Sequence, residues 1–378
     1  MNKEELFNFD NLVERRGTQC AKWDRAAKDT LPMWVADMDF PAPPAVLKAL
    51  RERVEHGVFG YGISDDLPGI ICGWLREEFH VTAEEDWIVL LPAIVPVLRA
   101  LGNLREGPVM INTPNYNNLL EAPLKAGKGT CLSPLKNPGE KYEMDFADMQ
   151  KRVVPELRLF FLCNPHNPVG RVYTRDELLE LSGFARKNNL LVISDEVHCG
   201  LAFDRLHIPW FSVDEYTMER SVTLIGPAKT YNLPGLPGGF AVIPNRDLRM
   251  EFKKTCFAMP DPGVFSVIAA RAAIGESREW KKAMLEYLRQ NRDYLENRLR
   301  KTFPEAKLPH VEGTYLQWID FRPLGIENPW QWLQDYPKIL ASDGKIYGTE
   351  GYVRLNFGTA RSRIEDALDR IEECVKAR

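Results

Sequence analysis

Short runs of apolar residues recur through the middle of the chain, with helical patterns between them. The runs lie at residues 86–91, 108–113, 158–163, 190–195, 220–225 and 238–243. Nearly continuous apolar runs are typical of strands that are buried on both faces of a parallel sheet. Between two of them, Thr174 is followed by Glu177 three residues later, a pattern that predicts a capped helix. The alternation of strands and helices predicts an α/β fold with helices on both faces of the sheet.

The pattern changes after about Phe265. Residues 277–303 carry apolar side chains at helical spacing and predict a long helix. Separate strands are predicted at 314–321 and 351–357, and an amphipathic helix follows at 362–378. This part of the chain therefore predicts a smaller α+β unit.

The order of these elements predicts the domain organisation. We expect a large α/β domain at 48–280 and a smaller domain at 281–378, with the N-terminal segment 1–47 joining the smaller one. Within the large domain, a short link rich in Gly and Pro joins the runs 220–225 and 238–243. A link this short indicates that these two strands are antiparallel.

Composition narrows the choice of partner and compartment. The chain has 378 residues, a net charge of −4 and 27% charged residues, so electrostatics give no reason to expect a nucleic-acid or membrane partner. No apolar stretch reaches the ~18 residues of a membrane-spanning helix. The seven cysteines contain no CxxC pair, which favours reduced thiols over a disulfide framework. We expect a cytoplasmic protein, and no metal site is predicted.

Polar residues follow several of the predicted strands. Asp195 ends one strand, Asn167 follows another within NPHNPVG, Lys229 follows a third, and Tyr116 follows a fourth. Taken singly, each has an ordinary explanation: a solvated lysine, a capping carboxylate, a turn asparagine and a core tyrosine. His198, close after Asp195, is likewise more often a structural histidine than a base.

Together these residues indicate pyridoxal 5′-phosphate chemistry. Ligands of open α/β sheets collect beyond the carboxyl ends of the strands. There Lys229 can form an imine with the cofactor, because desolvation lowers the pKa of a lysine amine. Asp195 can pair with the protonated ring nitrogen, Asn167 can donate to the ring oxygen, and Tyr116 can stack on the ring.

The chain resembles the fold-type I pyridoxal phosphate enzymes, the aspartate aminotransferase superfamily, and within it most resembles the MalY/PatB group of C–S β-lyases. The resemblance runs from about Phe9 to the C-terminus. It rests on KWD (22–24), LPMWVADMDFPAPPAVLKAL (31–50), VFGYGISDD (58–66), NPHNPVGRVYTRDEL (164–178), ISDEVHCGLAF (193–203), LIGPAKTYNLPGL (224–236) and GYVRLNFGTARSRIEDALDRI (351–371). It implies a mostly parallel sheet of the seven-stranded type and a smaller α+β domain.

The resemblance also implies residue roles at the ring of the cofactor. Lys229 would be the lysine that binds the cofactor as a Schiff base, and Asp195 would pair with the pyridine nitrogen. Asn167 would bond to the ring oxygen, and Tyr116 would stack on the ring face. His198 stands where aminotransferases carry a tyrosine, and a histidine there is usual in the lyase group.

Further roles that the resemblance implies concern the substrate and the partner subunit. Arg354 would bind the substrate α-carboxylate through a bidentate contact, although an arginine in isolation on a strand edge is usually a solvated cation. Trp34, Val35 and Ala36 would line the substrate site. Tyr61 would reach the cofactor phosphate of the neighbouring subunit, so the active unit would be a homodimer.

The phosphate end departs from the family pattern. Small or apolar residues replace the usual hydroxyl, cationic or glycine positions at Ala93, Gly226, Ala228 and Pro237. Backbone amides of Ile94 and Val95, which open a predicted helix, remain as phosphate donors. The missing side-chain contacts predict weaker cofactor retention than is typical of the family.

Three functions remain open. The first is a C–S β-lyase that acts on an L-amino acid such as cystathionine and releases a thiol, pyruvate and ammonia. The second is a class I/II aminotransferase, which the motifs MWVADMDF and DEVH disfavour. The third is a regulator that keeps the fold without turnover; retention of Lys229, Asp195 and Arg354 argues against it. The sequence leaves the substrate side chain open.

Overall fold

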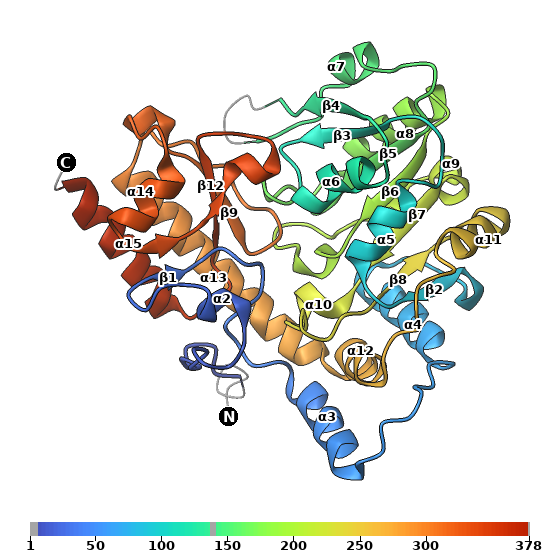
Figure 1. Cartoon of the computed structure of the whole chain (residues 1–378), viewed down its shortest axis with the longest axis horizontal. Coiled ribbons are helices and arrows are strands. Elements are labelled where there is room, and N and C mark those ends of the chain that lie inside the picture. Colours follow the sequence, from blue (N-terminus) through green and yellow to red (C-terminus); the bar gives the residue numbers. More distant parts are fainter. Residues whose placement is uncertain (1–6, 137–140, 377–378) are drawn as a thin grey trace.

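The computed structural model describes residues 7–136 and 141–376. Residues 1–6 of the predicted N-terminal segment and residues 377–378 of the predicted C-terminal domain therefore lie outside the described residues. The predicted α/β fold is confirmed: a mixed central sheet and its helices form one part of the molecule, and a smaller α+β part lies beside it (Figure 1).

The central sheet has seven strands in the order β2-β8-β7-β6-β5-β3-β4. They are β2 (Ile88–Leu91), β3 (Val109–Thr113), β4 (Thr130–Pro134), β5 (Leu159–Cys163), β6 (Leu191–Asp195), β7 (Ser221–Ile225) and β8 (Gly239–Val242). Neighbouring strands are parallel except β8, which is antiparallel to both β7 and β2. The predicted antiparallel pair is therefore confirmed. Strand β4 was not predicted, because it lies at the sheet edge, where half-exposed residues replace an apolar run.

Alternate side chains of each central strand enter two different cores. Leu159 and Phe161 pack on one face with helices α5 (Ile94–Leu101) and α6 (Asn117–Lys125). Phe160 and Leu162 pack on the other face with helices α7 (Phe146–Lys151) and α8 (Arg175–Lys187). This is the expected packing of a sheet that is covered on both faces. The helices of this part are α3 (Pro44–His56), α4 (Leu67–Phe79), α5 (Ile94–Leu101), α6 (Asn117–Lys125), α7 (Phe146–Lys151), α8 (Arg175–Lys187), α9 (Glu215–Glu219), α10 (Pro227–Thr230), α11 (Arg246–Thr255) and α12 (Val264–Glu276).

Helix α8 begins with the capping box that its sequence predicts. The Thr174 hydroxyl accepts a hydrogen bond from the Glu177 amide at 3.3 Å, and the Glu177 carboxylate accepts one from the Thr174 amide at 2.8 Å. The two hydrogen bonds satisfy the backbone amides of Thr174 and Glu177 and fix the start of the helix after the NPHNPVG loop.

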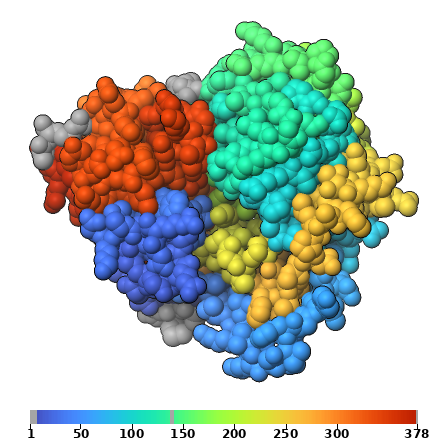
Figure 2. Space-filling view, in the orientation of Figure 1, coloured from blue at the N-terminus to red at the C-terminus, as the bar shows by residue number. Residues whose placement is uncertain are grey.

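The smaller part combines the two ends of the chain. A three-stranded antiparallel sheet has the order β11-β12-β9, and strand β1 pairs in parallel with β10. Its elements are α2 (Ala21–Asp24), β1 (Leu31–Pro32), α13 (Arg278–Thr302), β9 (Leu316–Asp320), α14 (Pro329–Asp335), β10 (Ile339–Leu340), β11 (Ser342–Asp343), β12 (Tyr352–Asn356) and α15 (Arg361–Lys376). The blue N-terminal segment accordingly lies against the red C-terminal elements in Figure 2. The domain boundaries at 47/48 and 280/281 stay predictions; they fall inside helices α3 and α13.

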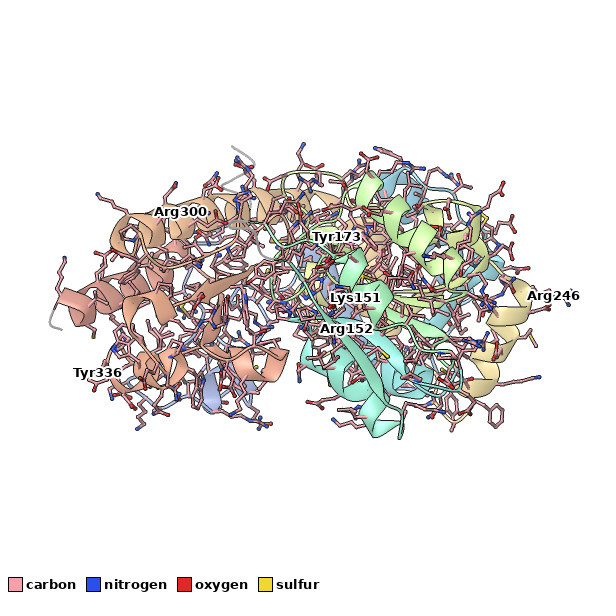
Figure 3. The ribbon with its side chains drawn as sticks, turned by 90° about the horizontal axis from the view of Figure 1, so that it is seen from above. Lys151, Arg152, Tyr173, Arg246, Arg300 and Tyr336 are labelled. Carbon is pink, nitrogen blue, oxygen red and sulfur yellow. The ribbon has the colours of Figure 1, made fainter. Side chains whose placement is uncertain are left out.

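The two parts lie side by side when the molecule is viewed from above (Figure 3). Tyr336 lies at the far end of the smaller part, Arg246 lies at the far end of the sheet-containing part, and Tyr173 lies near their junction. Among the described residues, no helix is both long enough and apolar enough to cross a membrane.

Candidate active site

A cavity of about 340 Å³ lies beyond the carboxyl ends of β5, β6 and β7. The yellow segment that follows β7 is visible between the N-terminal segment, the smaller part and the central sheet in Figure 2. Ten of the predicted site residues line this cavity: Val35, Ala36, Ile94, Val95, Tyr116, Asn167, Asp195, His198, Lys229 and Arg354. The fold thus brings together side chains that are separated by more than 300 residues in the sequence.

Asp195 is the last residue of β6. The strand register sets it beside Cys163 of β5 and Leu224 of β7, so its carboxylate emerges at the ligand end of the sheet. One carboxylate oxygen accepts a hydrogen bond from the Val197 amide at 3.2 Å. Burial, together with the charge of Glu196, raises the pKa of Asp195 to about 6. A buried carboxylate in this setting gains from a cationic partner in the cavity.

Lys229 lies in the single helical turn α10, directly after β7. Its Nζ donates a hydrogen bond to the Ala36 carbonyl at 2.6 Å. Burial, together with the charge of Arg354, lowers the pKa of Lys229 to about 8, although Asp37 and Asp195 act in the opposite direction. The lowered pKa makes the neutral amine, which is the reactive form, available near neutral pH.

Arg354 lies on β12 and is 4% exposed. Its guanidinium donates to Asn167 Oδ1 at 3.0 Å and to the Trp34 carbonyl at 2.8 Å. It also donates to Ser342 Oγ at 3.2 Å and lies 4.8 Å from the centre of the Tyr347 ring. No carboxylate of a described residue forms an ion pair with it. A buried guanidinium without a countercharge is costly, so this position favours an anionic ligand group.

Asn167 and His198 flank the same cavity. Because arginine only donates hydrogen bonds, the contact with Arg354 fixes the oxygen of Asn167 toward it and leaves the amide NH₂ as the donor for a ligand. His198 packs edge-on against Tyr315 with ring centroids 6.1 Å apart. Burial, with the charges of Lys229 and Arg354, holds the pKa of His198 well below its usual value, so the imidazole is neutral.

Tyr116 precedes helix α6 as its N-cap residue. Its hydroxyl accepts a hydrogen bond from Asn118 Nδ2 at 2.7 Å. Burial raises the pKa of Tyr116 to about 12, so the phenol stays protonated. An aromatic ring that is held in this way, at the wall of the cavity, can stack on a flat ligand.

The other two predicted residues lie outside the cavity lining. Trp34 contributes its backbone, because its carbonyl accepts from Arg354 and from Ser342 Oγ. Tyr61 projects fully into solvent from the irregular stretch between α3 and α4, with a relative exposure of 105%. Within one chain, Tyr61 therefore does not join the site.

The remaining wall of the cavity has few polar side chains. Its members are Ala93, Ile94, Val95, Ala228, Pro237 and Gly238. Ile94 and Val95 open helix α5, and the first amides of a helix have no partner within the helix. Gly226 does not line the cavity; a Cβ there would lie 3.2 Å from the Gly238 carbonyl oxygen. The small residue at 226 thus has a packing cause.

Sequence reasoning missed several residues that line the cavity. They are Asn117, Cys163, Val197, Pro234, Gly238 and Tyr347. Asn117 and Cys163 are next to predicted motif residues and could have been found by extending those motifs by one position. Tyr347 reaches the site from a distant 3₁₀ turn, and its sequence surroundings carry no signal of the contact.

The residue set fits a pyridoxal phosphate and an amino acid. Asp195 offers a carboxylate for a cationic ring nitrogen, and Lys229 offers an amine that is partly neutral near pH 8. Arg354 offers a guanidinium that forms no ion pair with a described carboxylate and could therefore bind the carboxylate of a ligand. The phosphate would meet backbone amides of α5 rather than cationic side chains of this chain.

Comparison with known proteins agrees with this arrangement. Residues 36–371 match the family model "Aminotransferase class I and II". The chain is 33% identical to cystathionine beta-lyase PatB of Bacillus subtilis (strain 168), with 97% of this chain and 99% of that protein covered. The PLP-bound putative aminotransferase from Clostridium difficile 630 superposes with a TM-score of 0.94 at 31% identity and covers 98% of this chain and 100% of its own.

A third relative is the PLP-bound C-S lyase from Staphylococcus hominis. Its structure has a TM-score of 0.90 at 29% identity and covers 98% of each chain. The predicted resemblance is confirmed: the chain belongs to the class I and II aminotransferase family.

Proposed function

We propose that this family member is a pyridoxal phosphate-dependent C–S β-lyase that splits a sulfur-substituted L-amino acid into a thiol, pyruvate and ammonia. The observation that carries the proposal is one cavity that gathers a reactive lysine, a buried carboxylate and a buried guanidinium, and neither of these two charged groups forms an ion pair with another described residue. The end-to-end similarity to PatB, which is named a cystathionine beta-lyase, supports the lyase reaction.

The residues divide the work among them. When bound, pyridoxal phosphate supplies an electron sink for the bonding pair of the substrate Cα–H bond. Asp195 would pair with the ring nitrogen, and Arg354 would orient the substrate by its α-carboxylate. Asn167 would donate a hydrogen bond to the ring oxygen. Tyr116 would stack on the cofactor ring.

Lys229 moves the proton. Its neutral amine takes the α-proton, while the Ala36 carbonyl accepts another of its N–H groups. The electron pair of the Cα–H bond then forms the Cα=Cβ double bond, the Cβ–S bond breaks, and the sulfur leaves with the electron pair of the Cβ–S bond as a thiolate. The aminoacrylate released takes up water and yields pyruvate and ammonia. The pKa of about 8 matches a base that works near neutral pH.

An aminotransferase is the second candidate. The family name and the relative from C. difficile favour it. The same lysine, carboxylate and guanidinium serve both reactions up to removal of the α-proton, so the cavity alone supports either. His198, at the position where aminotransferases carry a tyrosine, favours the lyase.

Pyruvate release separates the two reactions. Purified holoprotein is incubated with L-cystathionine, with and without a 2-keto acid acceptor, and pyruvate is measured. We expect pyruvate without any acceptor. Amino-group transfer that occurs only with the acceptor present would replace the lyase with the aminotransferase.

We further propose that the active unit is a homodimer. The stretch between α3 and α4 exposes Val58, Phe59 and Ile63 beside Tyr61, with relative exposures of 63%, 55%, 74% and 105%. An apolar stretch of this kind gains from burial against a second copy. In that dimer Tyr61 would contact the cofactor phosphate in the site of the partner subunit.

Mixing two inactive variants tests the shared site. Tyr61→Ala and Lys229→Ala subunits are unfolded together and refolded as hybrids; each hybrid dimer keeps one intact site. Random pairing of subunits predicts recovery of about a quarter of wild-type activity. Tyr336→Ala, which alters an exposed tyrosine far from the cavity, is the matched control and should stay fully active. No recovery on mixing would refute a Tyr61 contribution across the interface.

We propose a cytoplasmic location because the cysteine thiols form no disulfides among the described residues. All seven cysteines lie within the described residues and none is paired. Unpaired cysteines are usual in a reducing compartment.

A further inference from the structure

Residues Trp34 to Asp37, here called the 34–37 segment, contribute Val35 and Ala36 to the lining of the cavity. The segment follows β1 and has no regular secondary structure. The Asp37 amide donates to the Val35 carbonyl at 2.9 Å, which closes a tight three-residue turn with Ala36 at its tip. At that tip, the Ala36 carbonyl accepts the hydrogen bond from Lys229 Nζ.

Asn356 holds both ends of this turn. Its Nδ2 donates to the Val35 carbonyl at 2.5 Å and to the Asp37 carbonyl at 2.7 Å. Its Oδ1 accepts from the Gly358 amide at 2.7 Å, which fixes the orientation of the carboxamide. Every hydrogen-bonding group of this buried side chain is thereby used, and two of its contacts bracket the residue that contacts Lys229.

Strand β12 carries both side chains that hold the 34–37 segment from this side. Arg354 and Asn356 are two residues apart on this strand, so their side chains lie on the same face. Arg354 donates to the Trp34 carbonyl, while Asn356 donates on both sides of Ala36. The strand that carries the predicted substrate-binding arginine thus also sets the position of the 34–37 segment.

A charge cluster anchors the outer end of the same segment. Lys22 Nζ donates to the Asp37 carbonyl at 3.1 Å and lies 3.1 Å from the Asp39 carboxylate. Arg15 pairs with Asp37 at 2.8 Å and with Asp39 at 2.7 Å. Both the charge cluster and Asn356 therefore hold the turn at Asp37. At Val35 the charge cluster makes none of these contacts, and there Asn356 donates the hydrogen bond.

We propose that Asn356 is a positioning residue for Lys229. It holds the Val35–Asp37 turn so that the Ala36 carbonyl accepts one N–H of the lysine amine and directs the nitrogen lone pair toward the reacting atoms. Tyr315, whose hydroxyl donates to the same carbonyl at 3.0 Å, limits its movement from the other side. The proposal rests on the proposed function, in which Lys229 transfers the α-proton.

Asn356→Leu tests the proposal, because leucine fills a similar volume but donates no hydrogen bond. Misplacement of a catalytic group by about 1 Å costs on the order of 100-fold in rate, so kcat should fall by about 10- to 100-fold. KM should change much less, because Arg354 keeps its contacts with Asn167 and Ser342. Covalent attachment of pyridoxal phosphate to the apoprotein, followed by absorbance, should slow by a similar factor.

Gln317→Met is the matched control. Gln317 is also fully buried in the three-stranded sheet, and its Nε2 donates to the carbonyls of Pro309 and Trp318, away from the 34–37 segment. The Gln317→Met variant should lower the midpoint of thermal unfolding, as Asn356→Leu should, but leave kcat and the rate of cofactor attachment unchanged. Asn356→Ser, which keeps one donor, replaces the leucine variant if the latter does not fold, and should show a smaller fall in kcat.

Two outcomes would overturn the proposal. One is a wild-type kcat and attachment rate in the Asn356 variant; the other is a loss no larger than that of Gln317→Met. Lys229→Ala is measured alongside and stays inactive in either case if the proposed function holds. Failure of the role of Asn356 is therefore distinguishable from failure of the proposed function.

Discussion

The two ends of the cavity are built by different means. At the reactive end, Asp195, Lys229 and Arg354 place charged side chains that are held by hydrogen bonds; Asp195 and Arg354 are buried and Lys229 is half-buried. In the part of the wall that would face the phosphate, Ala93, Ala228 and Pro237 offer no hydrogen-bond donor from their side chains. Breaking the bonds of the substrate requires charged groups at fixed positions, and at this end the side chains of this chain supply them.

Anchoring an anion makes weaker demands. A phosphate can be held by helix amides, because the amides at a helix N-terminus point outward and carry partial positive charge. The first turn of α5, at Ile94 and Val95, would meet that need without a side chain. The comparison of the two ends indicates that the side chains of this chain determine the reaction more strictly than they determine the affinity for the cofactor.

The largest effect should come from Lys229→Ala at the reactive end. The variant loses the base for the α-proton, so β-elimination of L-cystathionine should fall by about 10²- to 10⁴-fold. Pyruvate release at saturating substrate measures the effect. Lys345→Ala, which alters an exposed lysine that pairs with Glu350, should retain full activity. Near-normal elimination by the Lys229 variant would remove the assignment of this lysine.

The next effect concerns the guanidinium. Arg354→Met removes a charge-assisted contact worth about 1.5–3 kcal/mol, so KM for the amino-acid substrate should rise by roughly 10- to 100-fold. Steady-state kinetics with L-cystathionine measure KM. Arg246→Met, at an exposed site far from the cavity, is the control. If KM is unchanged, the substrate carboxylate binds elsewhere.

A smaller effect should appear in the pH dependence of cofactor attachment. Only the neutral amine of Lys229 reacts, so the attachment rate of the apoprotein should rise with pH and level off above about 8. Because the charge of Arg354 helps to lower this pKa, Arg354→Met should shift the midpoint to higher pH. Stopped-flow absorbance between about pH 6 and 10 spans both sides of the expected midpoint. A midpoint near that of free lysine in the wild type would contradict the desolvated setting.

The smallest effect belongs to the phosphate end. Wild-type protein should lose pyridoxal phosphate during extensive dialysis, and Ala228→Ser should slow this loss. One added hydrogen bond contributes about 0.5–1.5 kcal/mol, or roughly a two- to tenfold change in dissociation. Ala147→Ser, on the exposed face of α7, should change nothing. Full retention by the wild type would mean that contacts from other residues replace the missing ones.

Sequence reasoning succeeded where the chemistry is local to a strand end. Asp195 and Lys229 each follow an apolar run, so their placement at the ligand end of the sheet followed from the strand prediction. The edge strand β4 was missed because a half-exposed strand carries no apolar run. Periodicity locates buried elements better than exposed ones.

Contacts across long sequence separations were less accessible. Tyr347 reaches the cavity through packing between the two parts of the molecule and does not stand at a strand end. The resemblance predicted Ala36 as a site residue, but the hydrogen bond from Lys229 to its carbonyl was not predicted. One signal for Asn356 was present: it lies two residues after Arg354 on the same predicted strand, hence on the same face. A residue two positions from a predicted site residue on a strand therefore merits the same scrutiny.

Arg354 and Trp34, whose carbonyl accepts the hydrogen bond, are 320 residues apart in the sequence. This separation determines how long after Trp34 the ribosome adds Arg354. During synthesis at about 5–20 residues per second, the two partners are made roughly 16–64 s apart. Throughout that interval the nascent chain carries the 34–37 segment without the strand that holds it. The central sheet can form earlier, because its strands end at β8 (Gly239–Val242). The last tenth of the chain thus decides when a partly made molecule becomes an enzyme.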